Sequence, residues 1–311
     1  MRPLFMKTTT PLHGLIAAPH TPFAADGSLN LAIVEKQAAL LLANGVTAAF
    51  IGGTTGETHS LALDERRALT QRWTEVARGT TLRVIVHAGS NCLADARALA
   101  AQAQQLKATA IAAVAPSYFK PRSVDTLVDC MAEIAAAGPE LPFYYYEIPV
   151  FTGIALSASE FLERGAQRIP NLAGLKFTSN NLMEYQLCLR AAGGTLDVAF
   201  GYDEMLLAAL SLGARGAVGS TYNFAAPIYH RLIAAFERGD LDAARREQFR
   251  SVQMIQVLVN HGFMGAAKAV MAMLGVNVGP ARLPNGSLTT EQAGKLRGDL
   301  EKLGFFEWIR R

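Results

Sequence analysis

Short apolar runs alternate with longer amphipathic stretches from the start of the chain to Ser220, and this alternation constrains the fold more than any other feature. Each run has four to six residues, the length of a buried strand. Eight runs are predicted to be strands, at residues 15–18, 48–51, 82–87, 110–115, 142–146, 172–176, 196–201 and 216–220. Strands separated by helices in this way form a parallel sheet with right-handed crossovers.

The stretches between the runs carry apolar residues at helical spacing. The first has Leu31, Val34 and Ala38 on one face, and the second is expected to open with Asp64 as its N-cap. The others are expected near residues 93–106, 123–137, 157–167, 181–192 and 203–212. Eight strand–helix units in 311 residues predict an α/β fold of the closed (β/α)₈ TIM-barrel type. A doubly wound open sheet is the alternative, but its Gly-x-Gly-x-x-Gly fingerprint is missing after the first run.

The chain beyond Ser220 shows helical patterns alone. They cover residues 224–238, 240–260, 262–274 and 289–304, with a loop at 275–287. The first of these helices is expected to close the barrel, and the others to form a C-terminal extension. Because no linker or shift in composition interrupts the chain, we expect a leader at 1–12, a barrel at 13–238 and a helical extension at 239–311 packed on the barrel.

Composition excludes several classes of function. Half of the residues are hydrophobic and 18% are charged, which favours a large buried core over disorder. The net charge is +3 and the basic residues are scattered, so nucleic acid is not an expected partner. Residues 1–10 lack the apolar stretch of a secretory signal, and no run is long enough to span a bilayer. We therefore expect a cytoplasmic protein without a membrane partner.

Cysteine and histidine give no sign of a metal site. Cys92, Cys130 and Cys188 are far apart and odd in number, and the six histidines are dispersed. We expect the cysteines to be small buried apolar residues of a protein in a reducing compartment. His87 ends a predicted strand, where it either faces a pocket or makes structural hydrogen bonds, and the second interpretation is favoured. No metal is expected.

Polar motifs directly follow six of the predicted strands. They are Pro19-His20-Thr21-Pro22, Gly53-Thr54-Thr55-Gly56-Glu57, Tyr146-Glu147, Lys176, Gly201-Tyr202-Asp203-Glu204 and Ser220-Thr221-Tyr222-Asn223. The carboxyl ends of all strands in a (β/α)₈ barrel meet at one face, where the site is built. Segments that are distant in sequence are therefore predicted to form one pocket.

Lys176 is the residue with the clearest chemical meaning. It ends a buried apolar run, whereas a surface lysine or an ion-pair partner seldom occupies such a place. Burial beside apolar side chains such as Leu175 and Phe177 would lower its pKa from about 10.4 toward about 7–8. An amine of that kind forms a Schiff base with a 2-oxo acid.

Two further groups could complete such chemistry. Strand alternation places Tyr144 and Tyr146 on one side and Tyr145 on the other, so the phenol of Tyr146 could transfer protons at the strand end. The turn at 53–57 offers hydroxyls and backbone amides to a carboxylate. Asp203 either caps the following helix or, with its neighbour, binds a polyol.

Together these motifs resemble the dihydrodipicolinate synthase and N-acetylneuraminate lyase superfamily, and the N-acetylneuraminate lyase branch most of all. The resemblance extends from about Gly14 to the C-terminal helices. It rests on Gly53-Thr54-Thr55-Gly56-Glu57, Tyr144-Tyr145-Tyr146-Glu147-Ile148-Pro149, Gly174-Leu175-Lys176-Phe177-Thr178, Gly201-Tyr202-Asp203-Glu204 and Gly219-Ser220-Thr221-Tyr222-Asn223. It implies a class I aldolase or related lyase that binds pyruvate as a Schiff base, needs no cofactor and forms a homotetramer.

The resemblance also implies roles for single residues. Lys176 is expected to form the Schiff base and Tyr146 to transfer the proton. Thr54 and Thr55 are expected to hold the pyruvate carboxylate and to place Tyr146. The other implied substrate contacts are Thr178, Gly201, Asp203, Glu204, Ser220 and Tyr118, the last at an aromatic position near the subunit contact.

Two positions bear on which substrate is used. Phe151 stands where the synthase branch has a carboxylate-binding arginine, and a phenyl ring cannot make that contact. Glu147 follows Tyr146 where lyases more often carry a neutral or weakly basic residue. Its carboxylate could repel an acidic substrate or perturb Tyr146, or it could pair with a cation.

The expected function is therefore the reversible cleavage of N-acetylneuraminate to N-acetylmannosamine and pyruvate. One alternative is a related aldolase or dehydratase that acts on another 2-oxo sugar acid. The other is a non-catalytic sensor that binds a small 2-oxo acid, although a sensor has no need for Lys176, Tyr146 and Thr55 together.

Overall fold

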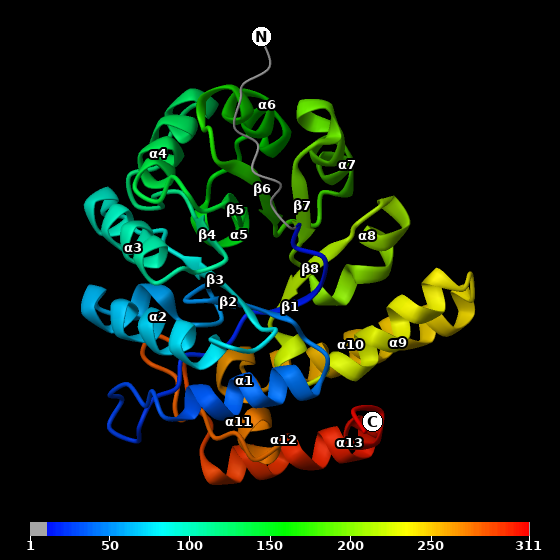
Figure 1. Ribbon diagram of the computed structural model, residues 1–311. Helices are drawn as coiled ribbons and strands as arrows, with labels where there is room; N and C mark the ends of the chain where they lie inside the picture. The colour runs from blue at the N-terminus through cyan, green and yellow to red at the C-terminus, as the bar shows by residue number, and fades with distance from the viewer. Residues whose placement is uncertain (1–10, 311) are drawn as a thin grey trace.

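The computed structural model describes residues 11–310 and contains a closed barrel of eight parallel strands in chain order, with β8 paired to β1 (Figure 1). The strands are β1 (Gly14–Ala17), β2 (Ala48–Ile51), β3 (Arg83–His87), β4 (Ala110–Ala113), β5 (Phe143–Glu147), β6 (Leu172–Phe177), β7 (Asp197–Phe200) and β8 (Gly216–Gly219). The predicted (β/α)₈ barrel is confirmed. Each strand lies within two residues of the predicted run, and β5 continues one residue further, through Glu147.

Helices surround the barrel on the outside (Figure 1). The principal helices between strands are α1 (Ile33–Ala43), α2 (Leu63–Ala77), α3 (Leu93–Gln105), α4 (Val124–Ala136), α6 (Ala158–Arg168), α7 (Leu182–Arg190) and α8 (Leu206–Leu212), and α9 (Ala226–Glu237) follows β8. The short helix α5 (Pro149–Thr152) and the 3₁₀ turns η1 (Thr58–Ser60), η2 (Ala191–Gly194), η3 (Asp203–Met205) and η4 (Thr221–Asn223) lie in the connections.

Alternation along the strands divides the buried side chains into two sets. Tyr144 and Tyr146 belong to the set that fills the barrel together with Phe50, whereas Tyr145 packs between the barrel and its helices. Tyr145 lies against Phe161 of α6, with the ring centroids 4.5 Å apart. The predicted orientation of the three tyrosines is thus confirmed, because side chains of a strand alternate with period two.

The C-terminal part consists of α10 (Leu241–Asn260), α11 (Phe263–Met273), α12 (Thr290–Leu303) and α13 (Phe305–Trp308). Helix α10 packs along α9 and also reaches η3. The connection between α11 and α12 returns to the barrel, where the Arg282 guanidinium bonds to the Glu65 carboxylate and to the carbonyls of Gly27 and Ser60. We retain the division at residues 238 and 239 as a proposal. The leader proposed at 1–12 lies almost wholly outside the described residues.

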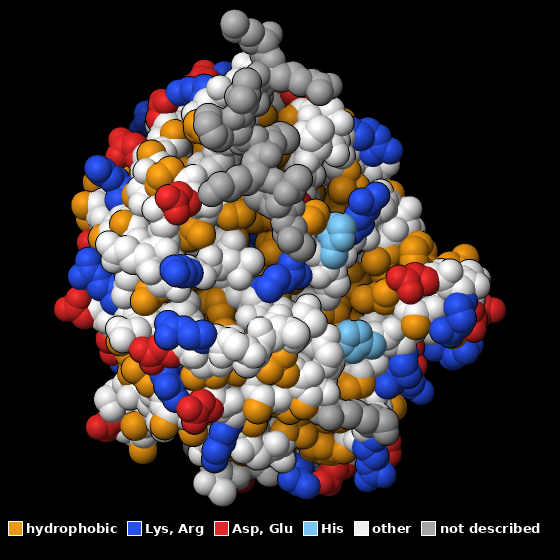
Figure 2. All heavy atoms as spheres, in the orientation of Figure 1, with side chains coloured by type: hydrophobic (Ala, Val, Ile, Leu, Met, Phe, Trp, Pro, Cys, Tyr) orange, Lys and Arg blue, Asp and Glu red, His pale blue; other side chains and the backbone are white. Residues whose placement is uncertain are grey.

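Two local predictions were wrong. Helix α2 begins at Leu63 rather than at an Asp64 cap, because the Glu65 carboxylate accepts the hydrogen bond of the Ala62 amide and closes the first turn. Cys92 is exposed, whereas Cys188 is buried and Cys130 is half-buried. On the face seen in Figure 2, basic and acidic side chains of the described residues are interspersed. Within residues 11–310, no helix has both the length and the apolar character needed to cross a membrane.

Candidate active site

A cavity of about 810 Å³ opens at the carboxyl ends of the strands. It gathers side chains from the ends of β2, β5, β6, β7 and β8 and the loops after them, as the placement of five of the six polar motifs predicted. The prediction was wrong for the motif at residues 19–22, which does not line the cavity, because Thr21 is buried and its hydroxyl donates to the Gly56 carbonyl at 2.6 Å. Nine of the ten predicted site residues line it, namely Thr54, Thr55, Tyr146, Lys176, Thr178, Gly201, Asp203, Glu204 and Ser220. The tenth, Tyr118, lies outside it.

Lys176 projects from β6 into the barrel mouth and is buried, with 5% of its surface exposed. Its Nζ lies 3.9 Å from the ring centroid of Tyr146 and 4.3 Å from that of Phe50. Burial lowers the pKa of Lys176 to about 7, and the negative field of Asp203 opposes this fall. The expectation that Leu175 and Phe177 wall this amine was wrong, because both alternate to the outer side of β6.

Tyr146 lies at the end of β5 with its hydroxyl directed at Thr54. The Tyr146 Oη and Thr54 Oγ1 atoms are 3.1 Å apart. Burial raises the pKa of the Tyr146 phenol to about 12, and hydrogen bonding to Thr54 opposes the rise. The resting side chain is therefore a neutral phenol in contact with both a hydroxyl and the amine of Lys176.

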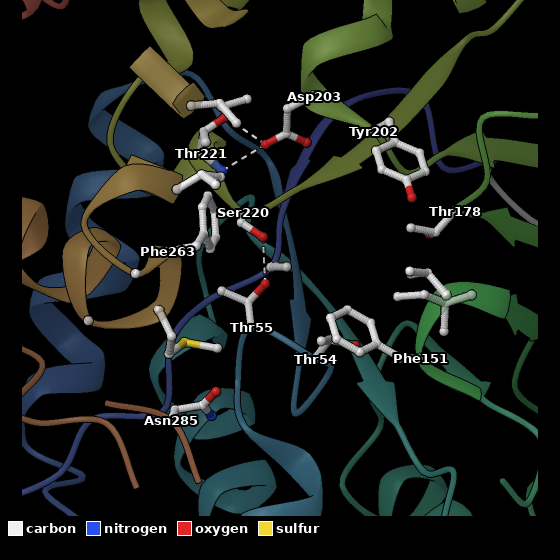
Figure 3. Close-up of a pocket in the computed structure, with 18 of the residues that line it drawn as sticks. Thr54, Thr55, Phe151, Thr178, Tyr202, Asp203, Ser220, Thr221, Phe263 and Asn285 are labelled. Carbon is white, nitrogen blue, oxygen red and sulfur yellow. Dashed lines mark hydrogen bonds between the residues drawn. The ribbon is translucent and has the colours of Figure 1, made fainter. Parts of the chain in front are cut away.

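The turn after β2 also carries Thr55, whose hydroxyl points across the cavity floor. Its Oγ1 lies 2.6 Å from the Oγ of Ser220, which follows β8 (Figure 3). This contact joins two motifs from opposite ends of the barrel sequence. Hydroxyls held in this way are already oriented, so they can bind a small anion with little reorganisation of the site.

Asp203 lines the cavity but is largely buried, and Thr221 of η4, the turn after β8, holds its carboxylate. Its Oδ2 accepts hydrogen bonds from the Thr221 amide at 2.8 Å and the Thr221 hydroxyl at 2.6 Å (Figure 3). A Cβ atom on Gly219 would come within 1.9 Å of Asp203 Oδ1, so the carboxylate requires a glycine there. Burial raises the pKa of Asp203 to about 7. The alternative of a helix cap was wrong, since Tyr202 holds the cap position of η3.

Thr178 and Gly201 lie side by side where β6 and β7 end. A Cβ atom on Gly201 would approach Thr178 Oγ1 to 2.1 Å, so the glycine makes room for this hydroxyl. Glu147 lies outside the cavity lining, and its Oε2 accepts a hydrogen bond from the Thr178 amide at 3.1 Å. Burial, together with the nearby Glu184, raises the pKa of Glu147 to about 7. Glu147 therefore acts on the site through the backbone of Thr178 rather than by facing a ligand.

Tyr118 is on the outer surface, with 78% of its area exposed. It packs edge-on against Phe119, which is also exposed, with the ring centroids 5.0 Å apart. Within this one chain Tyr118 touches none of the cavity. The expected substrate contact is therefore not made by the isolated protomer, because the loop after β4 directs this ring away from the barrel axis.

The C-terminal helices supply a wall that the sequence did not reveal. Figure 3 shows Phe263 on the side of Ser220 and Asn285 below it, with Tyr202 and Phe151 across the cavity. The wall residues beyond α9 are Ile255, Val259, His261, Gly262, Phe263, Met264, Gly265, Pro284, Asn285, Gly286, Ser287, Leu288 and Gln292. The His-Gly break between α10 and α11 was the one sequence signal that marks a change of direction there.

His87 makes structural hydrogen bonds, as favoured from the sequence. Its Nδ1 lies 2.8 Å from the Gly52 carbonyl, and its Nε2 accepts from the Val114 amide at 3.2 Å. Burial holds its pKa well below the ordinary value, so the ring is neutral. Among the described residues, no group of three or more His, Cys, Asp or Glu side chains is arranged to hold a metal ion.

A closed parallel barrel with a buried amine, a phenol and paired hydroxyls at the carboxyl ends of its strands is the arrangement of a barrel enzyme's active site. The chain belongs to the dihydrodipicolinate synthetase family, whose model matches residues 11–303. It is 37% identical over 301 residues to N-acetylneuraminate lyase of Rattus norvegicus, covering 96% of this chain and 94% of the relative. N-acetylneuraminate lyase A of Xenopus laevis is 41% identical, covering 88% and 90%.

The same relationship holds for solved structures. The structure of Proteus mirabilis N-acetylneuraminate lyase is 41% identical, has a TM-score of 0.92, and covers 95% of this chain and 100% of that one. The barrel and the C-terminal helices of this chain therefore match that structure over its whole length.

Proposed function

We propose that the protein cleaves N-acetylneuraminate reversibly to N-acetylmannosamine and pyruvate, with Lys176 as the Schiff-base residue. The protein is a lyase by family and relatives. The observation that carries the proposal is the amine of Lys176, which is buried without a carboxylate at ion-pair distance among the described residues and has a pKa of about 7. A large share of its amine is consequently unprotonated at neutral pH, as a nucleophile requires.

The first step is attack of the Lys176 amine on the 2-oxo carbon of the open-chain substrate. Loss of water then gives an iminium ion. In this proposal Thr55, together with the amides of its turn, binds the adjacent carboxylate, while the neutral phenol of Tyr146 lies against the amine. The contact of 2.6 Å between Thr55 and Ser220 supports this assignment, because it fixes the direction of the Thr55 hydroxyl.

The second step breaks the carbon–carbon bond. Tyr146 gives its proton to the departing water when the iminium forms, and the resulting phenolate then takes the proton of the hydroxyl beside the scissile bond. N-acetylmannosamine leaves as an aldehyde, and the electron pair of the bond moves into the iminium to give an enamine. A cation 3.9 Å from the ring stabilises the phenolate, so forming the iminium lowers the high pKa of Tyr146 when a base is needed. Protonation of the enamine and hydrolysis release pyruvate and restore Lys176.

The distal part of the substrate would extend between the far walls of the cavity. Thr178, Gly201, Asp203, Glu204 and Ser220 line the route from the amine toward the C-terminal wall and are proposed to contact the sugar-derived chain. Phe151 lines the same cavity with 71% of its surface exposed, and it offers an apolar ring in place of a cationic group. This difference supports a polyol substrate over one with a second carboxylate at that position.

Trapping with borohydride tests the covalent step. Incubation with pyruvate and borohydride, followed by digestion and mass spectrometry, is expected to place the reduced adduct on Lys176. An unmodified Lys176 in protein that turns over N-acetylneuraminate would overturn the mechanism. Pyruvate release from a panel of 2-oxo sugar acids tests the substrate, and preference for a non-aminated acid would overturn its identity.

A pair of tyrosine variants separates proton transfer from folding. Tyr146→Phe is expected to retain the trapped adduct but to lower kcat by roughly 10²- to 10⁴-fold, since the proton acceptor is lost. Tyr145→Phe is the matched control, because this tyrosine is adjacent and equally buried but faces the helices. Equal losses in both variants would contradict the assigned role of Tyr146.

The proposal includes a homotetramer in the cytoplasm. The exposed pair Tyr118 and Phe119 supports a subunit contact, because two large exposed aromatic rings on one loop are typical of interfaces. All three cysteines of the chain are free, which supports a reducing compartment. Light scattering coupled to size exclusion would measure the assembly, and a monomer at micromolar concentration would refute the tetramer.

A further inference from the structure

A second buried lysine, Lys268 of α11, reaches from the C-terminal helices into the turn that carries Thr54 and Thr55. Its Nζ lies 2.7 Å from Oε1 of Glu57, and the two side chains are 2% and 0% exposed. The same amine donates to the carbonyl of Pro280 at 2.7 Å and to that of Thr21 at 3.1 Å. An ion pair this deeply buried is costly to desolvate, and apolar residues can often replace such a pair without loss of stability. Stability alone therefore does not explain why the pair is present.

Glu57 holds an unusual backbone conformation in that turn. Its φ is 55°, in the left-handed region that side chains other than glycine seldom occupy. Its amide donates to the Thr54 carbonyl at 3.0 Å, and its carbonyl accepts from the Ser60 amide at 2.8 Å. Such a conformation persists only where the surroundings fix it, and the buried ion pair with Lys268 does so here.

The other oxygen of the Glu57 carboxylate faces the C-terminal connection. Oε2 accepts from the Arg282 amide at 2.8 Å and lies 3.5 Å from the Nδ2 atom of Asn285. Asn285 lines the cavity (Figure 3). One carboxylate therefore connects the turn at the floor of the site with the wall that the C-terminal part contributes.

We propose that Glu57, held by Lys268, is a positioning residue that fixes Thr54 and Thr55 against Tyr146 and Ser220. The inference rests on the proposed function, in which these two hydroxyls place the pyruvate half of the substrate. Loss of the ion pair frees the turn to relax from its left-handed residue and shifts both hydroxyls. A displacement of about 1 Å at such groups lowers the rate by roughly 100-fold.

Kinetics in the synthetic direction give a readout specific to this role. Glu57→Gln keeps the shape and the acceptor for the Arg282 amide but removes the charge. We expect the KM for pyruvate to rise by roughly 10-fold or more, with the KM for N-acetylmannosamine unchanged. A merely structural loss would reduce the active fraction and hence kcat, and would leave both KM values at the level of the wild type.

The matched control is Glu247→Gln. Glu247 forms a partly buried ion pair with Arg231 at 3.0 Å that joins α10 to α9, away from the cavity lining. Its variant is expected to change neither KM value. The double variant Glu57→Gln with Lys268→Met removes both charges together, and we expect it to have a lower KM for pyruvate than Lys268→Met alone, which leaves Glu57 unpaired.

Hydrogen exchange of the peptide spanning 53–60 completes the test without any turnover. We expect faster exchange there in Glu57→Gln than in Glu247→Gln. A wild-type protein that neither cleaves N-acetylneuraminate nor traps pyruvate would refute the proposed function. Faster exchange in Glu57→Gln would still support the conclusion that the Glu57–Lys268 pair holds the turn at 53–57. Unchanged exchange and an unchanged KM for pyruvate in Glu57→Gln would overturn the positioning role.

Discussion

Two lysines among residues 11–310 are buried to a similar depth, with 5% of the whole Lys176 residue and 3% of the whole Lys268 residue exposed. Lys176 lies over the rings of Phe50 and Tyr146, whereas Lys268 is paired with the carboxylate of Glu57 at 2.7 Å. Burial lowers the pKa of both, but in Lys268 the ion pair with Glu57 opposes the fall. Depth alone therefore does not make an amine reactive; the absence of a close counter-charge does.

The largest difference is expected in catalysis. Lys176→Met removes the nucleophile and should lower kcat for N-acetylneuraminate cleavage by roughly 10⁴-fold or more. Lys268→Met retains the nucleophile and should still form the borohydride-trapped adduct. Steady-state rates and adduct masses of the two variants measure the contrast. Comparable residual activity in both would erase the distinction between a reactive and a structural lysine.

The next difference is in stability, where Lys268 should matter most. Lys268→Met leaves the Glu57 carboxylate buried and unpaired, which is expected to lower the free energy of unfolding by about 3–5 kcal/mol. Adding Glu57→Gln should return part of this loss, since no buried charge then remains. Urea unfolding at pH 7 measures both values. A loss below about 1 kcal/mol for Lys268→Met would show that the pair is hydrated or readily replaced.

Lys176→Met is expected to raise the free energy of unfolding, whereas Lys268→Met lowers it. The pKa of Lys176 falls from 10.5 to about 7 on folding, so the folded protein disfavours the charged amine by at most ~5 kcal/mol. The variant should therefore be more stable than the wild type below pH 7, where lysine is charged in both states. The gain should shrink as pH rises from 7 toward 10.5. A gain that is independent of pH would contradict the lowered pKa.

The smallest expected effect is on the pH dependence of stability, and it concerns a buried carboxylate rather than a buried lysine. Glu147 is a second buried carboxylate, and burial together with Glu184 raises its pKa to about 7. The folded state then binds more protons than the unfolded state between pH 4.5 and about 7, so stability falls as pH rises through this range. Glu147→Gln should gain about 1–3 kcal/mol at pH 8 and little at pH 4. Unfolding curves at both values check this, and an equal gain at both would contradict it.

The barrel and the chemical end of the site were predictable because both depend on local patterns. Apolar runs of strand length specify the barrel, and the barrel brings every strand end to one face. Lys176, Tyr146 and Thr54 could be placed together for that reason alone. The prediction that Leu175 walls the amine was wrong, because side chains alternate along β6 and Leu175 packs on the outer side, opposite to Lys176.

The C-terminal wall and the Glu57–Lys268 pair could not be predicted in the same way. Each depends on how α10 and α11 dock, and a helix pattern states that a face is apolar without stating where it packs. The sequence pattern around Lys268 is that of a lysine in an amphipathic helix, and only the structure shows its contact with Glu57. The role expected of Tyr118 stays a prediction, because its exposed ring lies outside the cavity of its own chain and one chain alone does not show a contact between subunits.

The cavity is lined by two parts of the chain, the strand ends of the barrel and the C-terminal helices, and each part has a different role. The strand ends hold the groups proposed to make and break bonds, while α10, α11 and residues 284–288 enclose the space beyond them. Chimeras with related barrels could therefore acquire a different aldehyde preference by exchanging the C-terminal segment alone. The exchanged segment must keep a basic residue at position 268, since the buried carboxylate of Glu57 would otherwise have no counter-charge.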